Sequence, residues 1–192
     1  MDKTIISLCD YSGNWSKPYK DNGFNVIQVD LHLAQDIRLF KKIKKKVYGI
    51  LAAPPCTEFA GSGARWWKNK NPQLLFDNIA LVDACFRIIV VHNPKFWVLE
   101  NPVGRLVHWI GKPKYIFNPC DYGDAYTKKT CLWGNFNIPK KNPVDPKFIV
   151  MPNGKRMSAL HYFGSPKTRA TKRGITPMGF AKAFYEANCN YE

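Results

Sequence analysis

The sequence predicts an α/β protein with a mainly parallel β-sheet flanked by helices. Short apolar runs that favour strands alternate with helical patterns through the first two thirds of its 192 residues. Such alternation is typical of βαβ units, in which a helix carries the chain back to begin the next parallel strand. The expected strands are residues 4–9, 25–29, 47–52, 96–99 and 130–133.

Two helices complete this pattern. The clearest spans residues 73–91, where apolar side chains recur at spacings of three and four residues, as on the buried face of a helix. A terminal helix is expected at residues 177–188. Its predicted N-cap is Thr176, and Pro177 would occupy the first helical position, which proline favours.

Residues 134–174 differ from the rest of the chain. They contain five prolines and many basic residues, with weak periodicity. We expect irregular structure or a short β-hairpin there, with a turn at residues 152–154, because Pro, Asn and Gly are turn residues. The length fits one domain, or one domain with a small appendage.

The composition points to a protein that works inside a cell and binds a polyanion. The chain is 45% hydrophobic and can bury a core, yet no apolar run reaches the ~18 residues of a membrane helix. The N-terminus lacks a signal-peptide pattern, so we expect a cytoplasmic protein. The net charge of +15 favours a nucleic-acid partner, since neutralised phosphates release counterions; a merely soluble basic surface is the alternative. Basic residues cluster at 41–46, a block also typical of a solvated helix end, and at 167–173.

The six cysteines predict neither a disulfide framework nor a metal site. Their spacing is irregular, with no C-x-x-C, and no pair of histidines stands at ligand spacing. We therefore expect no metal, and most of these cysteines should be small buried side chains.

Chemically suggestive residues follow the expected strands. In parallel α/β sheets, ligands bind beyond the carboxyl ends of the strands, and the residues found there are 10–14, Asp30, Cys56 and Glu100. Pro54 and Pro55 end one strand and present Cys56, whose thiolate is the best side-chain nucleophile near neutral pH. A buried structural cysteine is the alternative.

Glu100 ends a strand of Phe, Trp, Val and Leu. Partial desolvation there raises a carboxyl pKa and suits proton donation, although a Glu that caps the next turn is the simpler reading. One helix joins the two strands, so a right-handed crossover can place them side by side, about 5 Å apart. Cys56 and Glu100 could then face the same planar ring.

With these elements the chain resembles the cytosine-5 DNA methyltransferase family, particularly small phage-like members. Residues 54–56 look like the family's catalytic Pro-Cys loop, and Glu100-Asn101 matches its Glu-Asn signature. The resemblance implies a Rossmann-like class I methyltransferase fold and S-adenosyl-L-methionine as cofactor. It also implies that Cys56 adds to carbon 6 of a cytosine flipped out of the DNA, that Glu100 donates to ring nitrogen 3, and that Asn101 belongs to the catalytic set.

The same resemblance implies a set of cofactor-binding residues around the strand ends. These are Asp10, Tyr11, Gly13, Asp30, Leu31, Asp36, Ile37, Pro54, Leu75 and Thr176. The chain departs from the family in three places. The glycine-rich loop, here residues 9–13, keeps one glycine; residues 127–130 carry lysines where the family has arginines; and Glu58 stands where Gln is common.

The target-recognition region is short. Residues 1–133 with 175–192 would form the catalytic domain, and residues 134–174 the recognition segment. The expected nucleic-acid contacts are Arg65, Lys68, Lys128, Lys129, Lys155, Arg156, Lys167 and Arg169. Trp66 and Trp67 either stack on bases or pack beneath a loop. We expect a monomer that acts on duplex or single-stranded DNA.

Several alternatives stay open at this point. The same chemistry could act on RNA or on a free cytidine nucleotide, although the charge of +15 favours a polymer. A modified cofactor could donate another group. An inactive relic could bind nucleic acid alone. A hydride-transferring enzyme fits poorly because the first turn lacks G-x-G-x-x-G.

Overall fold

A six-stranded sheet forms the centre of the computed structural model, which describes residues 3–162, 165 and 168–192. The strand order is β2-β1-β3-β4-β6-β5. Four neighbouring strands are parallel: β1 (Thr4–Leu8), β2 (Asn25–Val29), β3 (Val47–Ala52) and β4 (Phe96–Pro102). β6 (Thr130–Asn135) runs antiparallel to β4 and to β5 (Tyr115–Phe117).

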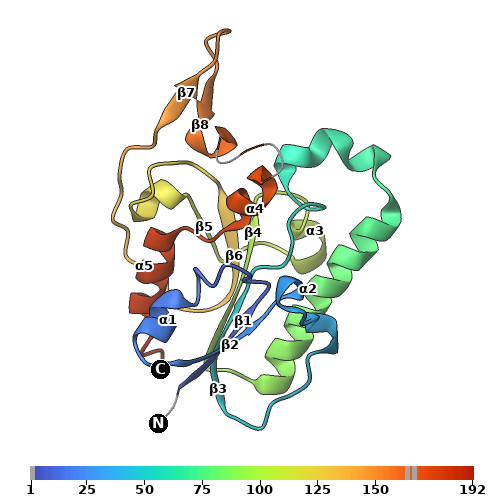
Figure 1. The fold of residues 1–192 in the computed structure, drawn as a ribbon, viewed down its shortest axis with the longest axis vertical. Coiled ribbons are helices and arrows are strands. Elements are labelled where there is room, and N and C mark those ends of the chain that lie inside the picture. Colours follow the sequence, from blue (N-terminus) through green and yellow to red (C-terminus); the bar gives the residue numbers. More distant parts are fainter. Residues whose placement is uncertain (1–2, 163–164, 166–167) are drawn as a thin grey trace.

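Helices cover both faces of this sheet (Figure 1). The elements α2 (Pro72–His92) and α3 (Val107–Ile110) lie on one face, and α1 (Lys17–Asp21) and α5 (Met178–Asn188) on the other. Because successive strand side chains point to opposite faces, Ile6 of β1 joins the core beneath α2, whereas its neighbour Ile5 joins the core beneath α5. The mainly parallel sheet agrees with the alternating sequence pattern, and the fold is Rossmann-like, as the family resemblance implies.

The strand register aligns the carboxyl ends of the four parallel strands. Leu8 pairs with Val29 on one side and with Ala52 on the other, and Ala52 pairs with Leu99. The residues that follow these pairs therefore share one edge of the sheet, where the carboxyl ends of parallel strands meet.

Short elements surround this edge. They are the 3-10 helices η1 (Leu31–Leu33), η2 (Ile37–Leu39), η3 (Gly61–Asn69), η4 (Pro119–Tyr122) and η5 (Ala159–Tyr162), the helix α4 (Arg169–Gly174), and the hairpin strands β7 (Phe148–Val150) and β8 (Arg156–Ser158). The hairpin projects from the end of the molecule that carries α4 (Figure 1). In the described part of the chain, no helix is both long and apolar enough to cross a membrane.

Most predicted elements are confirmed, with a few corrections. The strands at residues 25–29 and 47–52 have the expected bounds, and the hairpin turn at 152–154 is present. Thr176 is not the N-cap of the terminal helix: Pro177 holds that position in an extended conformation, without a side-chain cap. The lysine block at 41–46 is not a helix end but an irregular loop. β6 extends to Asn135, two residues beyond the strand expected at 130–133.

Candidate functional site

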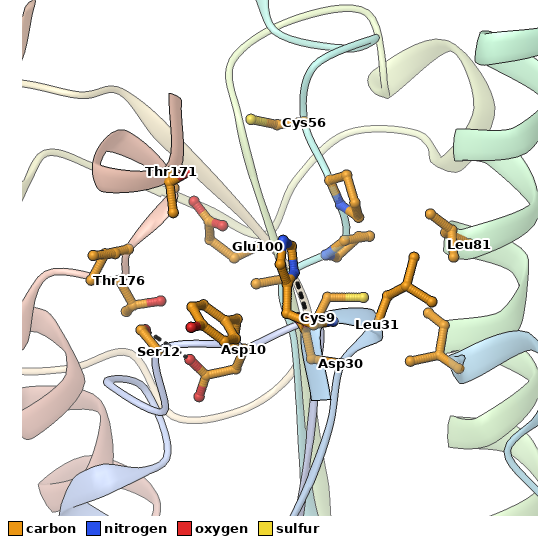
Figure 2. A pocket seen from close by; sticks show the side chains of 18 of the residues that line it. Cys9, Asp10, Ser12, Asp30, Leu31, Cys56, Leu81, Glu100, Thr171 and Thr176 are labelled. Atoms are coloured by element: carbon orange, nitrogen blue, oxygen red, sulfur yellow. Dashed lines mark hydrogen bonds and ion pairs between the residues drawn. The ribbon is translucent and has the colours of Figure 1, made fainter. Parts of the chain in front are cut away.

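A pocket of about 440 Å³ opens at the carboxyl edge of the parallel strands. Its size falls in the range of about 300–1,000 Å³ that is usual for small-molecule sites. It extends from the loop after β1 to the loop after β3, and α4 closes one side (Figure 2). Its lining includes Cys9, Asp10, Tyr11, Asp30, Leu31, His32, Asp36, Ile37, Arg38, Pro54, Cys56, Leu81, Glu100, Lys128, Thr171, Gly174, Ile175 and Thr176.

Cys56 and Glu100 line the same pocket. Figure 2 shows the Cys56 thiol and the Glu100 carboxylate pointing into the space between the loop after β3 and α4. Glu100 lies within β4, opposite Leu132 of β6. Leu99 of β4 pairs with Ala52, the last residue of β3. Glu100 therefore lies one residue beyond the carboxyl end of β3. The convergence of a thiol and a carboxyl group predicted from the strand order is present in the structure.

Lys128 is a cation that acts on both of these groups. Its Nζ lies 3.6 Å from Glu100 Oε1, and both side chains are largely buried. Burial raises the pKa of the Cys56 thiol, and the Glu100 charge raises it further, whereas Lys128 and Arg173 lower it. The pKa of Cys56 therefore depends on Lys128, which also pairs with the Glu100 carboxylate.

Asn101 does not line the pocket but holds the loop that does. Its side chain is fully buried, and Nδ2 donates to the carbonyl oxygen of Pro54 at 2.9 Å. Since Pro54 lies two residues before Cys56, this bond fixes where the thiol-bearing loop leaves β3. Asn101 is thus placed to position the loop rather than to touch a ligand.

The loop that carries Cys56 is also fixed from its other end. Gly61 N–H donates to Val103 O and Arg105 N–H donates to Phe59 O, both at 2.9 Å. This contact requires glycine at position 104, because a Cβ there would lie 1.9 Å from Phe59 O.

A buried carboxylate reinforces this contact. Glu58 forms an ion pair with Lys70 at 2.8 Å, and its carbonyl oxygen accepts from Arg105 Nε at 2.7 Å. The loop from residue 53 to residue 70 is therefore held as a single piece.

At the other end of the pocket, Asp10 organises the loop after β1. Its carboxylate accepts hydrogen bonds from the hydroxyls of Ser7, Ser12 and Ser16 and from the Ser16 amide. Burial raises the pKa of Asp10, and these hydrogen bonds oppose the rise. Asp10 lines the pocket as predicted, but most of its hydrogen-bonding capacity is used within the loop.

Asp30 directly follows β2, as the N-cap of η1, and lies twenty residues after Asp10 in the sequence. It is buried, and its Oδ1 accepts from the His32 amide at 2.8 Å and lies 2.9 Å from His32 Nδ1. Oδ2 forms neither of these bonds. An acidic residue at this place in a Rossmann-like sheet is suited to accept hydrogen bonds from a ribose hydroxyl.

Asp36 lines the pocket, but its carboxylate is already paired. Arg38 donates from Nε to both oxygens at 3.0 Å and from Nη2 to Oδ2 at 2.6 Å. These hydrogen bonds hold the pKa of Asp36 below its usual value. A ligand that needed this carboxylate would therefore have to compete with a bidentate arginine.

Two predicted cofactor residues lie off the pocket. Leu75 is half-buried and packs against the core beneath α2, and Leu81, nearly two turns further along the helix, lines the pocket instead. Gly13 has φ +69° and a Gln28 side chain 3.4 Å from where its Cβ would be. Gly13 therefore allows the tight turn of the loop after β1 and does not line the cavity. The other cofactor candidates, Tyr11, Leu31, Ile37, Pro54 and Thr176, line the pocket.

Sequence reasoning missed part of the lining. Thr171 and Gly174 belong to α4, within the segment expected to recognise the target, Ile175 follows α4, and Cys9 follows β1 directly. The apolar run that predicts β1 could have indicated Cys9. No pattern in the sequence indicates that α4 folds back onto the pocket.

The candidate nucleic-acid residues within the described ranges divide among four places. Arg65 and Lys68 are exposed on η3, Lys155 and Arg156 on the β7–β8 hairpin, and Lys129 beside the buried Lys128. Arg169 begins α4, and Lys167 lies outside the described residues. The Arg156 guanidinium lies 4.5 Å from the Phe148 ring.

The two adjacent tryptophans of η3 have different environments. Trp66 is 55% exposed, with the Arg65 guanidinium 4.9 Å from its ring. Trp67 is half-buried beneath Arg105, at 4.7 Å. Of the two readings left open by the sequence, stacking suits Trp66 and packing suits Trp67.

In the described part of the chain, no three His, Cys, Asp or Glu side chains gather as a metal site.

No protein-family model matches the sequence. A protein of Methanocaldococcus jannaschii, named "Putative type II methyltransferase M.MjaORF1200P", is 29% identical over 179 residues, which cover 83% of this chain and 48% of that protein. The chain thus spans about half the length of this relative. A solved E. coli structure, described as a "putative DNA modification methyltransferase" encoded within a prophage, has a TM-score of 0.48 and 16% identity, and covers 75% of this chain and 52% of that one.

Proposed function

We propose that the chain is a DNA (cytosine-5)-methyltransferase that uses S-adenosylmethionine. The observation that carries the proposal is one pocket lined by Cys56, Glu100 and Asp30, each at the end of a different parallel strand. The similarity to a protein named as a type II methyltransferase supports the same reaction class.

The pocket residues fit the proposed cofactor. The buried Asp30 carboxylate suits the ribose, and Leu31, Ile37 and Leu81 supply an apolar wall for the adenine ring. When bound, S-adenosylmethionine would supply a methyl group carried on a positively charged sulfur. The paired Asp36 is the least favourable feature, because Arg38 already occupies its oxygens.

The chemistry of the chain's own residues follows from the shared cavity. The Cys56 thiolate adds to carbon 6 of cytosine while Glu100 donates a proton to nitrogen 3, so carbon 5 becomes electron-rich and accepts the methyl group. Loss of the carbon-5 proton to a base then breaks the sulfur–carbon bond, which restores the Cys56 thiolate and returns the nitrogen-3 proton to Glu100.

DNA is the proposed substrate polymer because of the charge and its distribution. Residues 146–185 contain no Asp or Glu, and this stretch includes the hairpin and α4. Ser158 at the base of the hairpin donates to Thr127 O at 2.9 Å, next to Lys128. We propose residues 134–174 as the recognition segment, with the hairpin as its projecting part; a two-stranded ribbon fits a DNA groove.

A covalent trap tests the proposal. The protein is mixed with S-adenosylmethionine and with DNA or RNA in which cytosine is replaced by 5-fluorocytosine, which has no carbon-5 proton to lose. We expect a denaturation-resistant adduct with DNA, lost in Cys56→Ala and kept in the control Cys189→Ala. An adduct that forms with RNA but not with DNA would show that the substrate is RNA, and the proposed DNA substrate would be wrong. If the protein binds cofactor and unmodified target DNA but never forms the adduct, the enzyme assignment is wrong.

A further inference from the structure

The loop between η2 and β3 carries the densest positive charge in the chain. Five of the six residues 41–46 are lysines, and all five are exposed. They lie in an irregular loop, so their charge is not that of a solvated helix end. None of them takes part in an ion pair within the described ranges 3–162, 165 and 168–192.

The sixth residue explains why the lysines point outward. Ile43 is half-buried and packs against the core beneath α2, and its N–H donates to His92 Nε2 at 3.1 Å. His92 is held in turn, with Nδ1 2.7 Å from Ile88 O. The loop is thus pinned at its centre to α2, and the lysines on both sides of Ile43 are left in solvent.

The loop lies at the edge of the sheet opposite the pocket. It leads into the amino end of β3, at the lower end of the sheet in Figure 1, whereas Cys56 follows the carboxyl end of the same strand, near the middle of the molecule. A strand of this length separates them by about 20 Å. Lys95 extends the basic edge, since its N–H donates to Tyr48 O in β3 at 3.0 Å.

We propose that this lysine loop is a second binding surface for a nucleic-acid backbone, separate from the pocket, so that one molecule can hold two DNA segments. Exposed lysines without acidic partners attract phosphates without reading sequence. The choice of DNA as the polyanion rests on the proposed function. An anionic membrane is less favoured, because interfacial segments insert an apolar face beside their lysines, whereas Phe40 and Ile43 pack against the core and Leu39 is the one strongly exposed apolar side chain next to the lysines.

The experiment compares two variants of equal charge. In one, Lys41, Lys42, Lys44, Lys45 and Lys46 become Gln. The control changes five exposed lysines that lie outside both the loop and residues 134–174, namely Lys17, Lys20, Lys112, Lys114 and Lys182, to Gln. Melting temperatures check that both variants fold. Energy transfer between two differently labelled duplexes measures bridging, and DNA affinity is measured as a function of salt concentration.

We expect the wild type and the control to bridge the duplexes and the loop variant to lose bridging. The slope of log affinity against log salt should fall by about 0.9 for each phosphate contact removed, hence by up to about 4.5 in the loop variant. Equal losses in both variants, or unchanged bridging in the loop variant, would overturn the proposal. So would binding by the loop to anionic phospholipid vesicles but not to duplexes.

The outcomes also separate this proposal from the enzyme assignment. Cys56→Ala should bridge as the wild type does, since the thiol lies at the other edge of the sheet. Bridging without any 5-fluorocytosine adduct would refute the enzyme assignment and leave the loop surface standing. An adduct without bridging would refute the loop surface alone.

Discussion

Arg87 offers a test of the proposed cofactor site from outside the pocket. It lies on α2, and its guanidinium donates to the carbonyl oxygens of Phe40 at 3.0 Å, Ile37 at 3.1 Å and Arg38 at 3.0 Å. These carbonyls belong to η2 and its C-cap, and η2 places Ile37 in the pocket wall. Arg87→Met would keep the apolar stem of the side chain but remove all three hydrogen bonds.

The expected loss follows from those bonds. A hydrogen bond from a charged donor contributes about 1.5–3 kcal/mol when protected. Because Arg87 is exposed, solvent screening reduces this, and we assign about 1–2 kcal/mol to the whole set. If η2 must be ordered to bind the cofactor, affinity should fall roughly 5- to 30-fold, with little change in kcat at saturating cofactor.

Calorimetric titration with S-adenosylmethionine measures this loss directly. Arg87→Lys, which keeps the charge but not the fork of donors, should recover part of the affinity. Arg156→Met on the hairpin, an equal chemical change far from η2, should bind the cofactor as the wild type does. Unchanged affinity in Arg87→Met, or a lower kcat with unchanged affinity, would refute the reasoning.

Three further changes test other parts of the site. Gly104→Ala places a Cβ 1.9 Å from a backbone oxygen of the thiol-bearing loop, so adduct formation should slow at least about tenfold and denaturant unfolding should show a loss of about 1–3 kcal/mol; wild-type behaviour would mean that the loop contact is dispensable. Trp66→Ala should weaken DNA binding by about 1–3 kcal/mol in a titration, whereas Trp67→Ala should lower the melting temperature; the reverse pattern would contradict the assigned environments. Burial raises the pKa of Cys56 and Lys128 lowers it, so iodoacetamide labelling of the thiol, followed by mass spectrometry, should accelerate as pH rises. The profile should move to higher pH in Lys128→Met, and a shift to lower pH would refute this electrostatic account.

Much of the fold could be predicted because the local sequence pattern identifies the strands. The runs at residues 25–29 and 47–52 are mostly apolar, contain β-branched side chains, and are bounded by charged or turn residues, so their bounds match the structure. The approach of Cys56 to Glu100 follows from the same reasoning, since a single crossover helix leaves two parallel strands few arrangements other than adjacent ones.

The lining of the pocket could be predicted less well, because it depends on geometry that no local pattern encodes. Whether Leu75 or Leu81 faces the cavity depends on where α2 crosses the sheet, not on its apolar stripe, which contains Leu75. The pairing of Asp36 with Arg38 depends on the tight turn of η2. α4 reaches the pocket only through a fold-back of the chain between residues far apart in sequence.

Lys128 connects these observations. The sequence suggested a phosphate contact, but the side chain is largely buried, 3.6 Å from the Glu100 carboxylate, and it also lowers the pKa of Cys56. That separation is longer than the roughly 2.7–2.9 Å of a tight charged hydrogen bond. In the proposed mechanism, Glu100 gives its proton to the ring as Cys56 adds to carbon 6, so negative charge leaves the thiolate and a carboxylate is formed. Because Lys128 lies beside both groups, one cation is placed to stabilise the thiolate before this step and the carboxylate after it.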